Sequence, residues 1–224
     1  MEKKDIVAFV HAKGSSTRVP SKNMKILGDK PLFCHAIRNA KNSELVSKVV
    51  IDSDNDEILR IGEEYGAIPL KRPAELATNM ATGDDLAYWQ ASNYKDSLIV
   101  LQVIPTAPFL QPRSIDNAIQ LLLDNPCLDS VAGVYEDALY CWENGVPAYY
   151  KADGTIPNSF DMKKIVYETT GLYVNYTKYV LRDKRRLNPQ NCKPYILSKI
   201  ESVDINTMED FEFAEFLWKG MHQL

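Results

Sequence analysis

Short apolar runs alternate along this chain with longer segments whose apolar residues recur every three or four positions, and this alternation limits the fold most strongly. Residues 6–12, IVAFVHA, are apolar at successive positions, which is typical of a strand covered on both faces. Residues 32–40 place their apolar side chains on one helical stripe, with Pro31 suited to a first helical turn. The repeated order of strand, loop and helix predicts an α/β fold with a largely parallel sheet.

The same pattern predicts the later elements. Asp54, followed by Glu57, resembles the start of a helix. Pro112 is expected to open another helix. A further helix is expected over 177–186. A last helix is expected over 208–220, with Gly220 as its stop signal. Strands are predicted at 48–53, 67–70, 97–103, 130–135, 171–176 and 194–201.

Between about residues 136 and 168 the alternation breaks into a stretch rich in aromatic residues, Gly and Pro, without a clear helical stripe. This stretch is the expected insertion in an otherwise single domain spanning 1–224. It predicts a small arm that lies over the functional site as a lid or across a dimer interface.

Charge and hydropathy exclude several kinds of partner. The chain has 26 Lys and Arg against 30 Asp and Glu, a formal charge of −4, which argues against a nucleic-acid partner. No apolar run reaches the roughly 18 residues of a membrane span, and the N-terminal residues lack the pattern of a signal peptide. We therefore expect no membrane partner and a cytoplasmic location. The four cysteines lie far apart and are interpreted as reduced thiols.

The loop after the first predicted strand carries the strongest functional signal. Residues 12–23, AKGSSTRVPSKN, combine small residues with three cations, Lys13, Arg18 and Lys22. Backbone N–H groups of such a loop bind anions, and open α/β sheets bind ligands at this place. The loop matches neither GxxxxGKS nor GxGxxG. It predicts a phosphate site, with a solvated basic turn as the alternative.

Several segments resemble, in order, the cytidylyltransferases that activate acidic sugars, the family of CMP-sialic acid and CMP-Kdo synthetases. Residues 12–23 resemble the family's ARGGSKRIPxKN, and 202–211, SVDINTMEDF, its SIDIDTPEDL. The resemblance runs from residue 6 to residue 216. It also rests on VVIDSDNDEI (49–58), KRPAELATNMAT (71–82), PTAPFLQP (105–112) and YETTGLY (167–173). It implies a Rossmann-like nucleotidyltransferase fold and the conversion of CTP and a sugar hydroxyl into CMP-sugar and pyrophosphate.

The resemblance implies a nucleotide site built from the first loop and a later segment. Lys13 and Lys22 would act in catalysis by binding the triphosphate. Lys13 stands where the family usually has Arg, so the charge stays and the bidentate fork is lost. The remaining nucleotide-binding positions are Ala12, Gly14, Ser15, Ser16 and Asn23 in the loop, with Arg72, Ala81 and Thr82 at the cytosine edge.

The implied cofactor is Mg²⁺. Asp204 matches the family's catalytic metal-binding aspartate, and Asn206 stands where the family has a second one. An amide oxygen carries no charge, so the affinity for metal should fall, or one of two metal positions should be lost. The alternative is that both residues form the turn and cap before the last helix. Asp54 has two alternative interpretations, as a helix cap or as a residue of the site. His11 could face the triphosphate.

On the sugar side, Glu168 and Tyr173 match family positions, whereas other groups are missing. Ile104 replaces a family Gln, Leu110 an Arg, and NSFD (158–161) stands where the family has an RRQD-like stretch. Losing cationic and amide groups from a pocket for a carboxylate should change which acceptor fits.

Three hypotheses follow. The first is a Mg²⁺-dependent cytidylyltransferase that joins CMP to an acidic sugar, such as a sialic, legionaminic or related nonulosonic acid, and works as a homodimer through the arm. The second keeps the enzyme class but changes the acceptor or the nucleotide. The third is a catalytically silent nucleotide-binding module.

Overall fold

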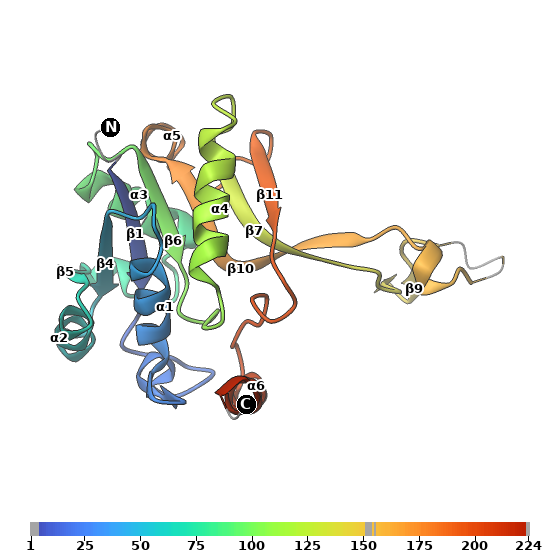
Figure 1. Cartoon of the computed structure of the whole chain (residues 1–224), viewed down its shortest axis with the longest axis horizontal. Coiled ribbons are helices and arrows are strands. Elements are labelled where there is room, and N and C mark those ends of the chain that lie inside the picture. The colour runs from blue at the N-terminus through green and yellow to red at the C-terminus, as the bar shows by residue number, and fades with distance from the viewer. Residues whose placement is uncertain (1–4, 151–153, 155, 223–224) are drawn as a thin grey trace.

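A computed structural model describes residues 5–150, 154 and 156–222 and shows a seven-stranded central sheet between helices (Figure 1). All neighbouring strands are parallel except β10, which runs antiparallel to both β6 and β7. The prediction of a mixed, mostly parallel α/β sheet is therefore confirmed. In spatial order the strands are β11 (Cys192–Ile196), β7 (Ser130–Asp137), β10 (Ile165–Tyr176), β6 (Ile99–Val103), β1 (Ile6–His11), β4 (Lys48–Ser53) and β5 (Ile68–Lys71).

Helices cover both faces of this sheet because alternate side chains of each strand point to opposite sides. On β1, Ile6, Ala8 and Val10 join the core under α1 (Leu32–Lys41), α2 (Asp56–Glu64) and α4 (Pro112–Leu123). Val7 and Phe9 pack on the other side, against α3 (Gly83–Asn93) and α5 (Thr177–Asp183). Strands buried on both faces explain the continuous apolar runs of the sequence.

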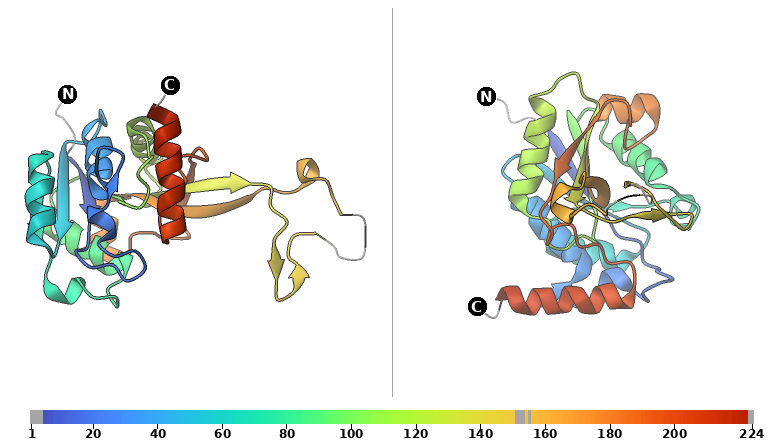
Figure 2. Two further views of the ribbon diagram at one scale, coloured as in Figure 1. Left: turned by 90° about the horizontal axis from the view of Figure 1, so that it is seen from below. Right: turned by 90° about the vertical axis from the view of Figure 1, so that its right-hand side faces the viewer.

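The C-terminal helix α6 (Met208–His222) lies apart from the sheet and packs on a small hairpin, β2 (Ile26–Leu27) and β3 (Lys30–Pro31) (Figure 2). His35 of α1 connects the two parts. It is fully buried, its Nε2 lies 2.9 Å from the carbonyl oxygen of Leu27, and its ring meets Trp218 edge to face.

The predicted arm projects far from the sheet (Figure 2). β7 and β10 continue into it, and β8 (Trp142–Glu143) pairs with β9 (Val146–Pro147) farther out. Trp142 is 64% exposed, and Phe160 of the short helix η3 (Ser159–Asp161) is 95% exposed. Of the predicted arm, residues 151–153 and 155 lie outside the described residues. The distal arm thus presents large apolar side chains to solvent.

Several predicted boundaries were wrong. The helix predicted over 177–186 ends at Asp183, where the left-handed backbone of Lys184 (φ 53°) closes α5. Asn55 caps α2 by accepting a hydrogen bond from the amide of Ile58, and Asp54 points elsewhere. β11 ends at Ile196, not residue 201, because Glu201 accepts hydrogen bonds from Ser198 and folds the chain into a turn. α6 continues through Gly220 to His222.

The sequence pattern also missed α3. This helix has no continuous apolar stripe, since its buried residues are Leu86, Ala87, Gln90 and Ala91. Its start is instead encoded by a capping box in which Thr82 and Asp85 satisfy each other's backbone amides.

Candidate functional site

A polar cavity of about 400 Å³ lies where β1, β5 and β6 end. Its walls come from the β1–α1 loop, the segment leading from β5 into α3, and the loop after β6. The carboxyl ends of parallel strands are where such sheets bind ligands. Of the predicted residues, those on its wall are Lys13, Ser15, Ser16, Lys22, Asn23, Arg72 and Ala81.

Two hydrogen bonds hold the β1–α1 loop in place. The amide of Gly14 donates to Asp54 Oδ1 at 2.8 Å, and Asn23 Nδ2 donates to the carbonyl of Lys13 at 2.8 Å. Among the described residues, the amides of Ser15 and Ser16 have no hydrogen-bond acceptor. Free amides beside cations form an anion-binding surface.

Two of the predicted loop residues support this surface without lining the cavity. Ala12 is fully buried and donates its amide to the carbonyl of Asp52 at 2.9 Å. Gly14 lies against Asn55, whose Cβ would be 2.7 Å from a Cβ added at this glycine. Asp54 tethers the loop through the amide of Gly14. Of its two predicted roles, the helix cap was wrong, because Asn55 caps α2.

Lys22 connects the loop to the segment before α6. Its side chain is buried, and Nζ donates to the carbonyl of Ile205 at 2.8 Å, next to Asp204. Burial and the charge of Arg18 lower the pKa of Lys22, while Asp204 and Asp210 act in the opposite direction. The first loop and the last predicted site segment therefore meet.

Asp204 offers a carboxylate oxygen for a cation. Its Oδ2 accepts from Thr170 Oγ1 at 3.3 Å and from Asn206 Nδ2. Its Oδ1 is buried and accepts no hydrogen bond from any described residue. A free, buried carboxylate oxygen fits a hard divalent ion. No group of three or more His, Cys, Asp or Glu side chains in the described ranges could hold a metal alone.

Asn206 has a second task, because its amide N–H donates to Asp210 Oδ2 at 2.8 Å at the start of α6. Its side chain holds Asp204 in the same arrangement. These contacts agree with the interpretation of Asn206 as a turn residue before the helix. To act as a metal ligand, its side-chain amide would have to rotate.

Thr170 has a strained backbone. Its φ of 57° is in the left-handed region, where a β-branched residue is rare. It lies in a break of register between Glu168 and Tyr173 on β10. The irregularity places its hydroxyl against Asp204.

Arg72 is fixed by a buried polar network that the sequence analysis missed. Its Nε donates to Asp52 Oδ1 at 2.7 Å, Gln90 Nε2 donates to Asp52 Oδ2 at 2.7 Å, and Gln102 Nε2 donates to Gln90 Oε1 at 2.9 Å. Burial raises the pKa of Asp52, and the neighbouring guanidinium and amide oppose this. The signal was present as polar residues in buried strands, Asp52 in KVVIDS and Gln102 in SLIVLQV.

The backbone amides predicted to bind the cytosine edge already donate hydrogen bonds within the protein. The amide of Ala81 donates to Thr78 Oγ1 at 3.3 Å, and the amide of Thr82 donates to Asp85 Oδ2 at 2.8 Å. Thr82 is the N-cap of α3 and lines a neighbouring cavity. In this conformation these two amides are not free for a base.

His11 lies at the end of β1 on the cavity wall. Burial and the charges of Arg72 and Arg186 lower the pKa of His11 to about 3. Its Nδ1 has no hydrogen-bond partner in the described part of the chain. The imidazole is therefore neutral at physiological pH.

The predicted sugar residues contact each other, because Tyr173 donates its hydroxyl to Glu168 Oε2 at 2.7 Å. Burial and this hydrogen bond raise the pKa of Tyr173. Arg186, which the sequence analysis placed only in the tail of a helix, lies with its guanidinium 4.2 Å from the centre of the Tyr173 ring. Two consecutive arginines in 177–186 were the available signal.

Taken together, a doubly wound sheet with a cationic, amide-rich cavity at its strand ends defines a nucleotide-binding α/β protein. Comparison with known proteins narrows this class. The family model described as cytidylyltransferase matches residues 7–171. The chain belongs to the cytidylyltransferase family.

Three relatives illustrate the similarity. The chain is 29% identical to CMP-N,N'-diacetyllegionaminic acid synthase of Legionella pneumophila, covering 95% of each protein. It is 27% identical to pseudaminic acid cytidylyltransferase of Campylobacter jejuni, covering 97% of each. With N-acylneuraminate cytidylyltransferase of Escherichia coli, 30% identity covers 93% of this chain and 51% of the relative.

Solved structures share the fold. A CMP:2-keto-3-deoxy-manno-octonic acid synthetase complexed with CTP superposes with a TM-score of 0.73 at 14% identity, covering 97% of this chain and all of the other. A 4-diphosphocytidyl-2C-methyl-D-erythritol synthase from Anaerococcus prevotii gives 0.64 at 15% identity, covering 97% of each. The predicted nucleotidyltransferase fold is confirmed. Among the described residues, none of the helices combines the length and apolar character that crossing a bilayer needs.

Proposed function

We propose that this protein transfers CMP from CTP to an acidic sugar of the nonulosonic class and releases pyrophosphate. The observation that carries the proposal is the meeting of Lys22 with the segment of Asp204, through the 2.8 Å hydrogen bond to Ile205. A single triphosphate can then contact the cationic loop and the carboxylate together. Relatives named as legionaminic and pseudaminic acid enzymes support the acceptor class.

The reaction needs alignment and charge neutralisation more than covalent chemistry. The anomeric hydroxyl oxygen of the sugar bonds to the α-phosphorus of CTP, and the bond from that phosphorus to the bridging oxygen breaks. Pyrophosphate leaves with the electron pair, and the hydroxyl proton goes to solvent. Lys13, Lys22 and the free amides of Ser15 and Ser16 hold the departing phosphates.

We include Mg²⁺ in the proposal. Asp204 would hold the ion through its buried, unpartnered Oδ1, with phosphate oxygens and water completing the shell. The ion would supply charge neutralisation of the triphosphate. Thr170 and Asn206 orient the carboxylate through its other oxygen.

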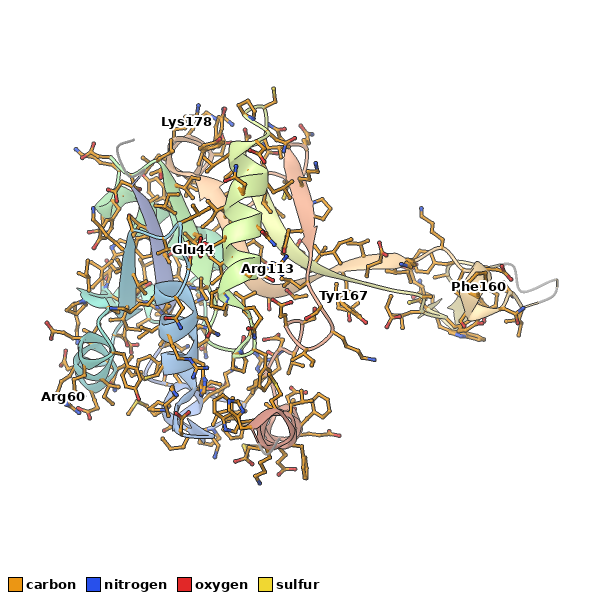
Figure 3. The ribbon with its side chains drawn as sticks, viewed as in Figure 1. Glu44, Arg60, Arg113, Phe160, Tyr167 and Lys178 are labelled. Carbon is orange, nitrogen blue, oxygen red and sulfur yellow. The ribbon has the colours of Figure 1, made fainter. Side chains whose placement is uncertain are left out.

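We also propose a homodimer that uses the arm. Phe160 lies at the far end of the arm, well away from the sheet (Figure 3), and is 95% exposed. Exposed apolar side chains of this kind mark protein contacts. NSFD (158–161), the stretch expected near the sugar, forms the short helix η3 on this distal part. In the proposed homodimer it would be available to the cavity of the second copy. Sedimentation of the intact protein tests this, and a monomer at high micromolar concentration contradicts it. A cytoplasmic location stays a prediction.

The function is tested by pyrophosphate release with each of the four common nucleoside triphosphates and a panel of 2-keto sugar acids. Release that needs CTP, one acidic sugar and Mg²⁺ supports the proposal. Saturable CTP binding without release under any acceptor contradicts it and favours the silent nucleotide-binding module.

One observation favours a second candidate, the same enzyme class with a different acceptor or nucleotide. Ile104, which stands where the family has Gln, lines the cavity and contributes no hydrogen-bonding side chain there. Thermal stabilisation by another triphosphate but not by CTP would support this candidate.

A further inference from the structure

Arg186 lies between two cavities. It lines the 400 Å³ cavity described above and a neighbouring one of about 440 Å³, which also contains Thr82, Gly83 and Glu168. The residue follows α5, and its backbone amide donates to Asp84 Oδ1 at 3.0 Å, which fixes the loop against the first turn of α3. A single guanidinium thus faces both spaces.

The guanidinium of Arg186 has no charged partner in place. None of the described residues accepts a hydrogen bond or forms an ion pair with it. The ring of Tyr173, 4.2 Å away, covers one face of its plane and leaves the edge with its N–H donors unpaired. The residue is only partly exposed, so this cation is oriented but not neutralised by the protein.

Gly83 makes room for this arrangement. A Cβ on Gly83 would come within 2.3 Å of Arg186 Nη1 and 2.6 Å of Cζ. The guanidinium therefore rests on the first residue of α3, where the N-terminal end of the helix dipole also carries positive potential. Two positive groups side by side are stable together when they share an anion.

The reacting end of the proposed acceptor would be close by. Asp204 contacts Thr170 of β10 at 3.3 Å, and Arg186 lies over the ring of Tyr173, three residues further along the same strand. The guanidinium and the carboxylate proposed to hold the metal therefore lie near one short stretch of β10. In a 2-keto sugar acid the carboxylate is bonded to the carbon that bears the reacting hydroxyl. If that hydroxyl is near Asp204, the carboxylate falls on the side of Tyr173 and Arg186.

We propose that Arg186 binds the carboxylate of the acidic-sugar acceptor and takes the place of the cationic groups that the sequence lacks at Leu110 and 158–161. This inference rests on the proposed function. Arg186 is a specificity-determining residue at the border of the nucleotide and acceptor spaces. Glu168 holds the Tyr173 hydroxyl, so the ring stays packed under the guanidinium.

The test compares Arg186→Ala, Arg186→Lys and the control Lys184→Ala in the pyrophosphate-release assay with the full-length protein. Lys184 is an exposed cation two residues away that lines neither cavity. Loss of a charged, bidentate pair should raise the acceptor KM of Arg186→Ala about 10- to 100-fold. The CTP KM should change less than about twofold, and Arg186→Lys should be intermediate, because a lysine keeps the charge without the fork.

A second arm of the experiment changes the acceptor instead of the protein. An analogue with the carboxylate reduced to a primary alcohol should react poorly with the unaltered enzyme, and Arg186→Ala should cost it less than about twofold, because the pair is already absent. An equal loss with acid and alcohol acceptors overturns the inference. So does a raised CTP KM with an unchanged acceptor KM, or a rise in the acceptor KM of the control Lys184→Ala as large as that of Arg186→Ala. Absence of pyrophosphate release by the unaltered protein with every acceptor overturns the proposed function itself, and the inference with it.

Discussion

Arg72 and Arg186 both line the central cavity, but the protein holds them in different ways. Arg72 is buried and its guanidinium is bound by Asp52, which Gln90 also contacts. Arg186 is stacked on an aromatic ring and lacks an anionic partner among the described residues. The proposed nucleotide side is therefore organised before a ligand arrives, whereas the proposed acceptor side leaves a charge for the ligand to satisfy.

The largest expected effect concerns the buried pair on the nucleotide side. Asp52→Ala leaves the Arg72 charge buried and unpaired, which should lower the free energy of unfolding by about 3–5 kcal/mol. Urea denaturation measures this, and Asp52→Asn gives a milder variant if the alanine protein does not fold. The matched control is Glu136→Ala, which breaks the exposed pair with Lys164 at the base of the arm and should change nothing measurable. An equal loss of unfolding free energy in Asp52→Ala and Glu136→Ala would contradict the difference expected between the buried and the exposed pair.

The next effect concerns catalysis at the nucleotide side. Lys22→Ala removes the buried ammonium between the loop and Ile205, and kcat/KM for CTP should fall about 100- to 1,000-fold. Circular dichroism should show an unchanged fold. Lys25→Ala, which removes a cation of the same loop that lies over Phe211, should retain activity. Near-normal turnover of Lys22→Ala would show that Lys22 does not bind the phosphates.

A third prediction tests how pH acts on the junction of α1 with the β2–β3 hairpin and α6, where His35 is buried. Burial lowers the pKa of His35 to about 4, from an unfolded value near 6.5. As pH falls below about 6.5 the unfolded chain takes up the proton first, so folding loses up to about 3 kcal/mol by pH 4 and nothing above pH 7. Urea denaturation should show that the free energy of unfolding falls between pH 7 and pH 5. This fall should be about 2 kcal/mol smaller in His35→Gln than in the unaltered protein. An unchanged loss would mean that His35 is not the group responsible.

The smallest expected effect sharpens the boundary between the two sides. Asn206→Asp adds a second carboxylate beside Asp204, so the Mg²⁺ concentration for half-maximal activity should fall about three- to tenfold. Magnesium titration at saturating CTP and acceptor measures it. An unchanged or higher half-maximal Mg²⁺ concentration would show that this position does not face the ion.

The nucleotide side was also the more predictable one from sequence. The apolar pattern of 6–12 and the cationic loop at 12–23 are local signals, and the structure joins them at one cavity as expected. The contacts of the Asp52 network could not be derived in this way, because Asp52 and Gln90 are 38 positions apart in the chain and meet only through packing.

On the acceptor side, sequence reasoning missed Arg186, the cation proposed to bind the acceptor carboxylate. It comes from a loop after α5 and becomes part of the site because Gly83 and Tyr173, on two other elements, leave space and a stacking surface for it. α3, which carries Gly83, was also missed for lack of an apolar stripe. A residue whose role depends on three separate segments has no local signature.

β10 joins the arm to the reaction site as one continuous strand. It pairs with β7 from Ile165 in the arm to Asn175 in the core, and Thr170, with its strained backbone, lies between. From Ile165 to Thr170 the strand covers only about 17 Å. A force applied to the distal arm therefore acts on the backbone that positions Asp204.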